Sequence, residues 1–150
     1  VEQLRRTASL SLQGSEVIPQ LIQQPKAKDA AVRYWAFIGI GNLASQAKTA
    51  QQVTRSALKD ESPSVRIAAA RALCHMNQPE QALPVLVEQL KSKREWVRLN
   101  AAIVLDEIDE QARPTIEALQ VARKDKQNKY VARVANRALN ELLGTNNTVR

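Results

Sequence analysis

The segment AVRYWAFIGIGNLA, from Ala31 to Ala44, contains a residue spacing that can bind a nucleotide cofactor. Gly39, Gly41 and Ala44 form the pattern G-x-G-x-x-A, which in dinucleotide-binding proteins makes a tight turn after a strand and at the start of a helix. The apolar spacing of this segment instead predicts a helix that already runs from about Asp29, so both glycines fall late in that helix. We therefore interpret the glycines as residues that let helices pack closely or let the helix end, and we expect no bound cofactor.

His75 is the only histidine of the chain, and it lies between Cys74 and Met76. A zinc site requires three or four ligands, and no acidic residue lies within four positions of this histidine. Cys74 has no further histidine with which to form a catalytic Cys-His arrangement. We interpret both residues as packing residues near a helix end and expect no metal site.

A group of carboxylates occurs at Asp106, Glu107, Asp109 and Glu110. General acid–base catalysis requires paired carboxylates in a sheltered cleft, whereas neighbours on a surface turn point in several directions. The group also lacks the glycine and the ligand order of a calcium-binding EF-hand loop. We interpret it as a solvated turn. Because no nucleophile with its base, no phosphate loop and no metal ligand set can be assembled, the sequence predicts a domain that is not an enzyme.

The chain is basic, with 22 Lys and Arg against 15 Asp and Glu and a net charge of +7. Most charges alternate in sign, as on solvated helix faces, but residues 123–137 carry six basic side chains against Asp125 alone. This candidate basic patch consists of Arg123, Lys124, Lys126, Lys129, Arg133 and Arg137. Its local net charge of +5 makes an anionic polymer, either nucleic acid or a sulfated polysaccharide, an alternative partner.

One pattern of apolar residues repeats along the chain and indicates which elements position these side chains. Val32 is followed by Ala36, Ile40 and Leu43, an arrangement that puts the four side chains on one stripe of a helix. Copies of the pattern begin near residues 4, 32, 65, 97 and 131. Further helices are expected between the copies, and no segment shows the alternation of a strand. A single helical hairpin cannot bury its stripe, but stacked hairpins can.

The sequence therefore predicts an all-α fold, a right-handed α-solenoid of about four and a half helical hairpins with about nine helices. We expect one repeat domain over residues 1–143 and a polar tail over 144–150. Pro19, Pro84 and Pro114 are expected near the starts of the intervening helices, where a missing N–H costs little. No apolar run is long enough to span a membrane.

Arginine follows the first position of the stripe in most copies, and the repeat arginines are Arg33, Arg66 and Arg98. An acid precedes or lies near each of them, at Asp29, at Asp60 or Glu61, and at Glu95. We expect each guanidinium to pair with an acid or a carbonyl at the turn between helices and so to join adjacent repeats. The alternative is a row of anion-binding arginines.

Two aromatic residues occupy the same repeat position, because Trp96 precedes Val97 and Tyr130 precedes Val131. This position lies near the edge of a repeat and is expected to be partly exposed. Aromatic residues are frequent anchors in protein interfaces, so both are candidate interface residues. The alternative is that they cover the turns between repeats.

The segments VRYWAFIGIGNL, VRIAAARALCHM and VRLNAAIVLDEI, each followed by a helix such as ALPVLVEQL, resemble the short form of the HEAT-repeat family. This resemblance covers nearly the whole chain and implies stacked helical hairpins. HEAT repeats serve many roles, so the resemblance implies a scaffold or interaction domain without naming the partner.

The order of these segments, ending with KYVARVANRALNELL, more closely resembles the HEAT-type region at the C-terminus of some bacterial sulfatases. That resemblance implies an accessory domain, exported to the periplasm or the cell exterior, whose partner is the catalytic domain of the same chain or another subunit. The sulfatase motif C-x-P-x-R or S-x-P-x-R is absent, because ESPSVR has Glu61 in the first position and Arg66 one residue late. No sulfatase active-site residue therefore carries over, and the start at Val1 fits a processed protein or a fragment. Short HEAT repeats also occur in lyases acting on tetrapyrrole proteins, a further alternative.

Overall fold

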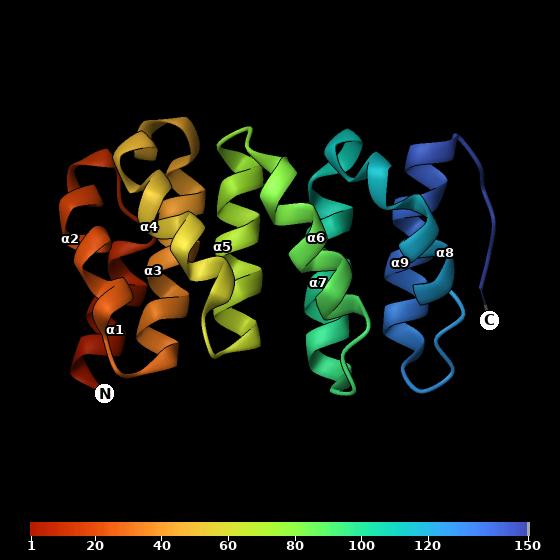
Figure 1. Cartoon of the computed structure of the whole chain (residues 1–150), viewed down its shortest axis with the longest axis horizontal. Helices are drawn as coiled ribbons and strands as arrows, with labels where there is room; N and C mark the ends of the chain where they lie inside the picture. Colours follow the sequence, from red (N-terminus) through yellow and green to blue (C-terminus); the bar gives the residue numbers. More distant parts are fainter. Residues whose placement is uncertain (150) are drawn as a thin grey trace. The chain divides into compact units, whose positions relative to one another are not determined.

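The computed structural model describes residues 1–149, which form nine α-helices joined by loops and 3-10 turns without any β-strand (Figure 1). The five helices that carry the repeated stripe are α1 (Glu2–Leu10), α3 (Ala30–Leu43), α5 (Pro63–His75), α7 (Glu95–Glu107) and α9 (Lys129–Leu143). Each begins two residues before the first position of its stripe. The predicted all-α fold of repeated helical hairpins is thereby confirmed.

Shorter helices connect these five. They are α2 (Ile18–Gln23), α4 (Gln51–Ser56), α6 (Pro79–Leu90) and α8 (Ile116–Ala122). Short 3-10 segments extend three of them, at Ser15–Val17, Gln24–Lys26, Ala44–Ala50, Ala57–Lys59 and Asp109–Thr115. A 3-10 segment has poorer hydrogen bonds than an α-helix, so these connecting elements are mostly irregular.

Polar side chains and a glycine set the ends of the striped helices. The Asp29 Oδ1 accepts a hydrogen bond from the Ala31 N–H at 2.8 Å and caps α3. Asn128 caps α9 in the same way through Tyr130 N–H. Gly144 ends α9 with a φ of 64°, a conformation that glycine adopts without steric cost. These caps satisfy backbone groups that a helix end would otherwise leave unpaired.

The chain forms two compact units, and the boundary falls inside α6, after Ala82. In the first unit, α3 lies between α1 and α5 and contacts both of them. Its core contains Phe37, Ile40 and Leu73, all fully buried. In the second unit, α7 and α9 contact each other and α8 packs on α9 (Figure 1). The expectation of one repeat domain over residues 1–143 stays a prediction.

The two glycines of the G-x-G-x-x-A pattern lie inside α3, where they allow close approach of neighbouring helices. A Cβ atom on Gly39 would lie 2.9 Å from the Cα of Ser11, at the end of α1. A Cβ atom on Gly41 would lie 3.2 Å from the Cα of Ala72, in α5. Because α3 runs from Ala30 to Leu43 without a turn at these residues, the pattern is a packing feature and not a cofactor loop.

The expected positions of the prolines are partly wrong. Pro19 is near the start of α2, but Pro84 is the sixth residue of α6, which begins at Pro79. Pro114 lies inside the 3-10 segment before α8. A proline inside a helix removes the bond to the carbonyl four residues earlier, here that of Glu80, which is exposed in the first turn. Solvent can satisfy that carbonyl, and the helix continues to Leu90.

The described part of the tail, residues 144–149, folds back onto α9. The side-chain amide groups of Asn136 and Asn140 both donate to the Asn147 carbonyl, at 2.8 and 2.9 Å. The Asn147 N–H in turn donates to Asn140 Oδ1 at 2.9 Å. These bonds attach the polar residues after Gly144 to the last helix.

Candidate functional site

Arg98 of α7 holds two successive loops of the second unit together. The side chain is buried, and its Nε donates to Asp125 Oδ2 at 2.7 Å. Its Nη1 donates to the carbonyls of Ser92 and Lys93, at 2.9 and 3.3 Å. Its Nη2 donates to Gln127 Oε1 at 3.1 Å. One guanidinium therefore fastens the loop after α6 to the loop after α8.

The carboxylate of Asp125 is fully engaged by these contacts. Its Oδ1 also accepts hydrogen bonds from the Gln127 and Asn128 N–H groups, at 2.8 and 2.9 Å. Burial by itself would raise the pKa of Asp125, but the hydrogen bonds from Arg98 and from the two backbone N–H groups outweigh it. The net result is a pKa below the usual value of the carboxyl group.

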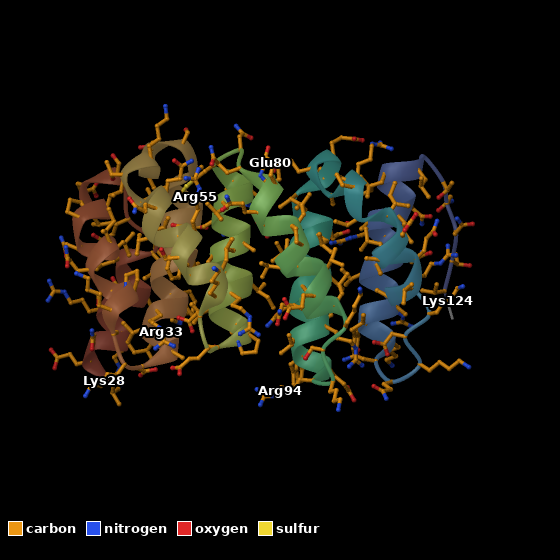
Figure 2. The ribbon with its side chains drawn as sticks, viewed as in Figure 1. Lys28, Arg33, Arg55, Glu80, Arg94 and Lys124 are labelled. Carbon is orange, nitrogen blue, oxygen red and sulfur yellow. The ribbon has the colours of Figure 1, made fainter. Side chains whose placement is uncertain are left out.

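Arg33 makes the same arrangement in the first unit. It donates to the carbonyls of Ala27 and Lys28, both at 2.9 Å, and to both carboxylate oxygens of Asp60, at 2.8 and 2.9 Å. Figure 2 labels Arg33 and Lys28 at this junction. Glu61 Oε1 accepts a further bond at 3.1 Å.

For Arg33 and Arg98, the bound acid differs from the neighbouring acid that the sequence suggested. Asp29 precedes Arg33 but serves as the cap of α3, so the bound acid is Asp60, from the loop one repeat later. Asp125 stands in the same relation to Arg98. Arg66 donates to the main-chain carbonyl of Asp60 at 2.7 Å, in line with the expected arginine–carbonyl contact at the turn.

A groove in the second unit opens between α6 and α8, beside the two loops that Arg98 joins. Its volume is about 980 Å³. The apolar part of the lining comes from Val87 and Leu90 of α6 and from Ala118 and Val121 of α8. Val121 is 71% exposed, so this part of the apolar lining is accessible to a ligand.

Four exposed lysines surround this groove. They are Lys91, Lys93, Lys124 and Lys126. Lys124 and Lys126 belong to the basic patch expected from the sequence, and Figure 2 labels Lys124 after α8. The sequence interpretation missed Lys91 and Lys93. A signal for them exists, because each precedes its counterpart in the next loop by one repeat length, 33 residues.

The six residues of the expected basic patch come from the end of α8, the loop after it and α9, and their action as one patch stays a prediction. Lys129, Arg133 and Arg137 lie on successive turns of α9, and Arg123 caps the end of α8. Arg137 forms an ion pair with Asp106 and is thereby less available to an anion. Hydrogen bonding to Asp106 raises the pKa of Arg137 above its usual value.

The interpretation of the carboxylate group as a solvated turn is wrong for Asp106. This residue belongs to α7, is buried and pairs with Arg137 of α9. Glu110 does lie at the surface, where it pairs with Arg113 at 2.5 Å. Helix α7 continues through Glu107, so its last turn places Asp106 towards α9 and not in the turn that follows.

Trp96 and Tyr130 are both exposed on the helices α7 and α9, which contact each other. Trp96 is 75% exposed and Tyr130 55% exposed. Ile103, two helical turns after Trp96, is 44% exposed on the same helix. The Nζ of Lys129 lies 5.4 Å from the centre of the Tyr130 ring. We name Trp96, Ile103 and Tyr130 the aromatic face.

The remaining candidates for chemistry are engaged in packing. Cys74 is buried, and its burial, together with the charge of Glu80, raises the pKa of the thiol to about 12. His75 Nδ1 lies 3.2 Å from the Gly41 carbonyl oxygen. Within residues 1–149, His, Cys, Asp and Glu side chains form no cluster that could hold a metal ion. No helix in this range has both the length and the apolar character needed to cross a bilayer.

Comparisons with known proteins concern the repeats. A family model described as HEAT repeats matches residues 18–94 and 52–140. No curated protein matches the chain. An engineered protein solved by the Northeast Structural Genomics Consortium is 22% identical with a TM-score of 0.65, over 93% of this chain and 71% of that one. A second engineered protein from the same consortium is 23% identical with a TM-score of 0.67, over 97% of this chain and 76% of that one. These identities show a common fold alone.

Proposed function

Because this chain belongs to the HEAT-repeat family, we propose that it is a non-catalytic scaffold that binds another protein domain through the aromatic face of α7 and α9. The observation that carries this proposal is the exposure of Trp96 and Tyr130 at equivalent positions of two helices that contact each other. An exposed tryptophan offers a large rigid surface whose burial stabilises an interface at little entropic cost.

The surroundings of the candidate catalytic side chains within residues 1–149 support a binding role. The thiol of Cys74 is buried and protonated at neutral pH, and His75 lies against the carbonyl of Gly41. Arg33 and Arg98 have their side-chain donors committed to loops of the fold. The aromatic face has no such structural role, since its side chains project from the repeats.

The proposed partner is the catalytic domain of a sulfatase-type enzyme, on the same polypeptide or in another subunit. This part of the proposal rests on the resemblance of the segment order to the HEAT-type region of bacterial sulfatases. Such an enzyme would place the chain in the periplasm or outside the cell. The hydrolysis would belong entirely to that other domain.

The test begins with the gene upstream of the codon for Val1. If it encodes a domain with C-x-P-x-R or S-x-P-x-R, that domain is produced separately and its binding to this chain is measured by calorimetry. We expect Trp96→Ala with Tyr130→Ala to weaken binding by about a hundredfold or more, the effect of losing two interface anchors. Leu12→Ala, an exposed leucine in the first unit, serves as the control.

Two results would contradict the proposal. Unchanged binding in the double variant would move the interface away from the aromatic face. A gene without any such domain, together with a lack of sulfatase in complexes purified from the source cells, would remove the sulfatase partner.

A second candidate function is binding of nucleic acid or a sulfated polysaccharide through basic side chains. It is favoured by Lys129 and Arg133, which are exposed on successive turns of α9, and by the net charge of +7. Phosphate-driven binding would weaken steeply with salt, with a logarithmic slope of about −0.9 for each phosphate contact on duplex DNA. Absence of binding at low salt would exclude it.

A further inference from the structure

We infer that the groove between α6 and α8 is a docking site for an acidic peptide segment with leucine-like side chains on one face. The inference rests on the proposed role of the chain as a binding scaffold but concerns a surface separate from the aromatic face. Val87, Leu90, Ala118 and Val121 provide the apolar wall, and four exposed lysines provide the charge.

The charge of this groove is specific to the second unit. The two loops joined by Arg98, residues 91–95 and 123–126, contain six basic and two acidic side chains, a net charge of +4. The equivalent loops joined by Arg33, residues 26–30 and 58–61, contain three of each and are neutral. The fold and the arginine junction are the same, so the excess of lysine is not required by the junction itself. Charge complementarity therefore indicates an acidic partner.

Arg98 and Asp125 already hold the two loops together, so the loops do not need the lysines for their connection. Asp125, the acid nearest to Lys124 and Lys126 in the sequence, directs its carboxylate to Arg98 and to two backbone N–H groups. It therefore neutralises a buried arginine rather than the lysines at the rim. Each lysine head can then meet a carboxylate of a ligand while its aliphatic stem lies along the groove.

The apolar wall favours a peptide over a nucleic acid or a sulfated polymer. Single-stranded nucleic acid binds on aromatic side chains, and none of the described residues that line this groove is aromatic. Phosphate and sulfate groups have no apolar surface to place against Val121, whereas leucine side chains do. A short amphipathic helix places leucines on one face and carboxylates beside them, which matches this lining.

The length of α8 sets the length of the leucine stripe that a ligand helix must present. Its seven residues span about 10 Å, which is about two helical turns. The probe is a fluorescein-labelled synthetic peptide of about twelve residues, with leucine at i, i+3, i+4 and i+7 and glutamate elsewhere. One matched peptide has lysine in place of glutamate, and another has serine in place of leucine.

Fluorescence anisotropy with the 150-residue chain measures the affinity of each peptide. We expect the leucine–glutamate peptide to bind at least about tenfold more tightly than either matched peptide, because each of them removes one of the two matched features. If the leucine–glutamate peptide binds no more tightly than either one of the matched peptides, the groove is not an acidic-peptide site.

Charge reversal locates the binding. The double variant Lys93→Glu with Lys124→Glu is expected to lower the affinity for the leucine–glutamate peptide by about tenfold or more. Val121→Ser is expected to lower the same affinity by about threefold or more. The control is Lys28→Glu with Lys59→Glu, which changes the equivalent exposed lysines at the Arg33 junction by the same total charge. All five positions are exposed, and circular dichroism checks that each variant is folded. If both double variants lose the same affinity for the peptide, the peptide is attracted by net charge alone, and the proposed site is wrong.

Two further measurements separate this inference from other functions. In the first, heparin or duplex DNA competes with the labelled peptide. If either binds more tightly than the peptide and its affinity is unchanged in Val121→Ser, the ligand of the groove is a polyanion and not a peptide. Trp96→Ala is expected to leave peptide binding unchanged, so loss of the aromatic-face partner and loss of the peptide are distinguishable. Loss of peptide binding in Trp96→Ala would move the site away from α6 and α8.

Discussion

Buried arginines connect successive repeats at the level of single residues. Arg98 exposes only 7% of its surface, and burying its charge is costly unless the charge is paired and every donor is used. Asp125, Gln127 and two loop carbonyls meet that requirement. Removing the arginine would leave Asp125 charged and partly buried without its main partner.

Replacement of Arg98 by methionine tests this arrangement. We expect Arg98→Met to lower the free energy of unfolding by about 3 kcal/mol at neutral pH, because one partner of a buried pair is lost. Chemical denaturation followed by circular dichroism measures the change. Arg113→Met is the control, since its pair with Glu110 lies in solvent and should matter little.

The same variant has an expected dependence on pH. In the natural protein, the pKa of Asp125 lies below 3.8, so its contribution to stability is present above that pH and is lost as pH falls through the folded value. Without Arg98, burial would raise the pKa of Asp125, and its protonation in acid would relieve the unpaired charge. The difference in stability between the two proteins should therefore shrink as pH falls towards 3.8 and below. A constant difference would contradict this role of Asp125.

The identity of the bound acid could not be predicted from sequence neighbours. Asp29 and Asp60 are both candidates for Arg33, but only the fold shows that Asp29 is used as a helix cap and that the loop at Asp60 lies beside Arg33. The repeat of the helices was visible in the sequence. Applied to the loops, the same repeat places Asp125 after Arg98 at the spacing that Asp60 has after Arg33. The pairing itself depends on contact between Arg98 in α7 and a loop residue 27 positions later in the chain.

At the level of elements, close helix packing depends on small residues at defined positions. Gly39 faces the end of α1, where the Cα of Ser11 would lie 2.9 Å from an added Cβ atom. The contacting atom belongs to the backbone and cannot move aside alone. Leu21, from α2, lies within 3.1 Å of the same position. The first three helices of the chain therefore meet at this glycine.

Alanine at residue 39 tests the close approach. Alanine is favoured over glycine within a helix by about 1 kcal/mol, yet we expect Gly39→Ala to destabilise the protein by about 1–3 kcal/mol because α1 must move. Thermal unfolding measures the net effect. Gly41→Ala is the milder comparison, because the nearest backbone atom to its added Cβ, the Cα of Ala72, lies at 3.2 Å instead of 2.9 Å. If Gly39→Ala is more stable than the natural protein, α1 can move away from residue 39 without a loss of stability.

At the level of the whole molecule, the chain contains two compact units, each with its own buried leucines. Leu73 of α5 is fully buried in the first unit, and Leu139 of α9 is 1% exposed in the second. In repeat proteins, stability is approximately a sum over repeats and their nearest neighbours. A destabilising substitution in one unit should therefore lower the stability of that unit more than that of the other.

Hydrogen exchange tests this independence. Leu139→Ala creates a cavity that costs about 3 kcal/mol, and we expect the loss of amide protection to be larger in α7 and α9 than in α3 and α5. Leu73→Ala should produce the opposite distribution. Mass spectrometry of peptides from each helix provides the measurement. An equal loss of protection in both units would mean that the chain unfolds as one cooperative body.

The sequence by itself determined the periodic features of this protein. The helix type, the number of helices and the starts of the striped helices follow from spacings within a few turns and from the repeat length, which are local properties of the chain. It also excluded the dinucleotide loop, because the apolar stripe passes through Gly39 and Gly41 without a break.

The tertiary structure alone decided which side chains from different repeats come together. It pairs Arg98 with Asp125, buries Asp106 against Arg137 and gathers lysines from two loops around the α6–α8 groove. Each of these groupings joins residues about one repeat apart, and none has a local signal in the intervening sequence. They arise because stacked hairpins bring corresponding loops side by side, a relation that exists only after the chain has folded.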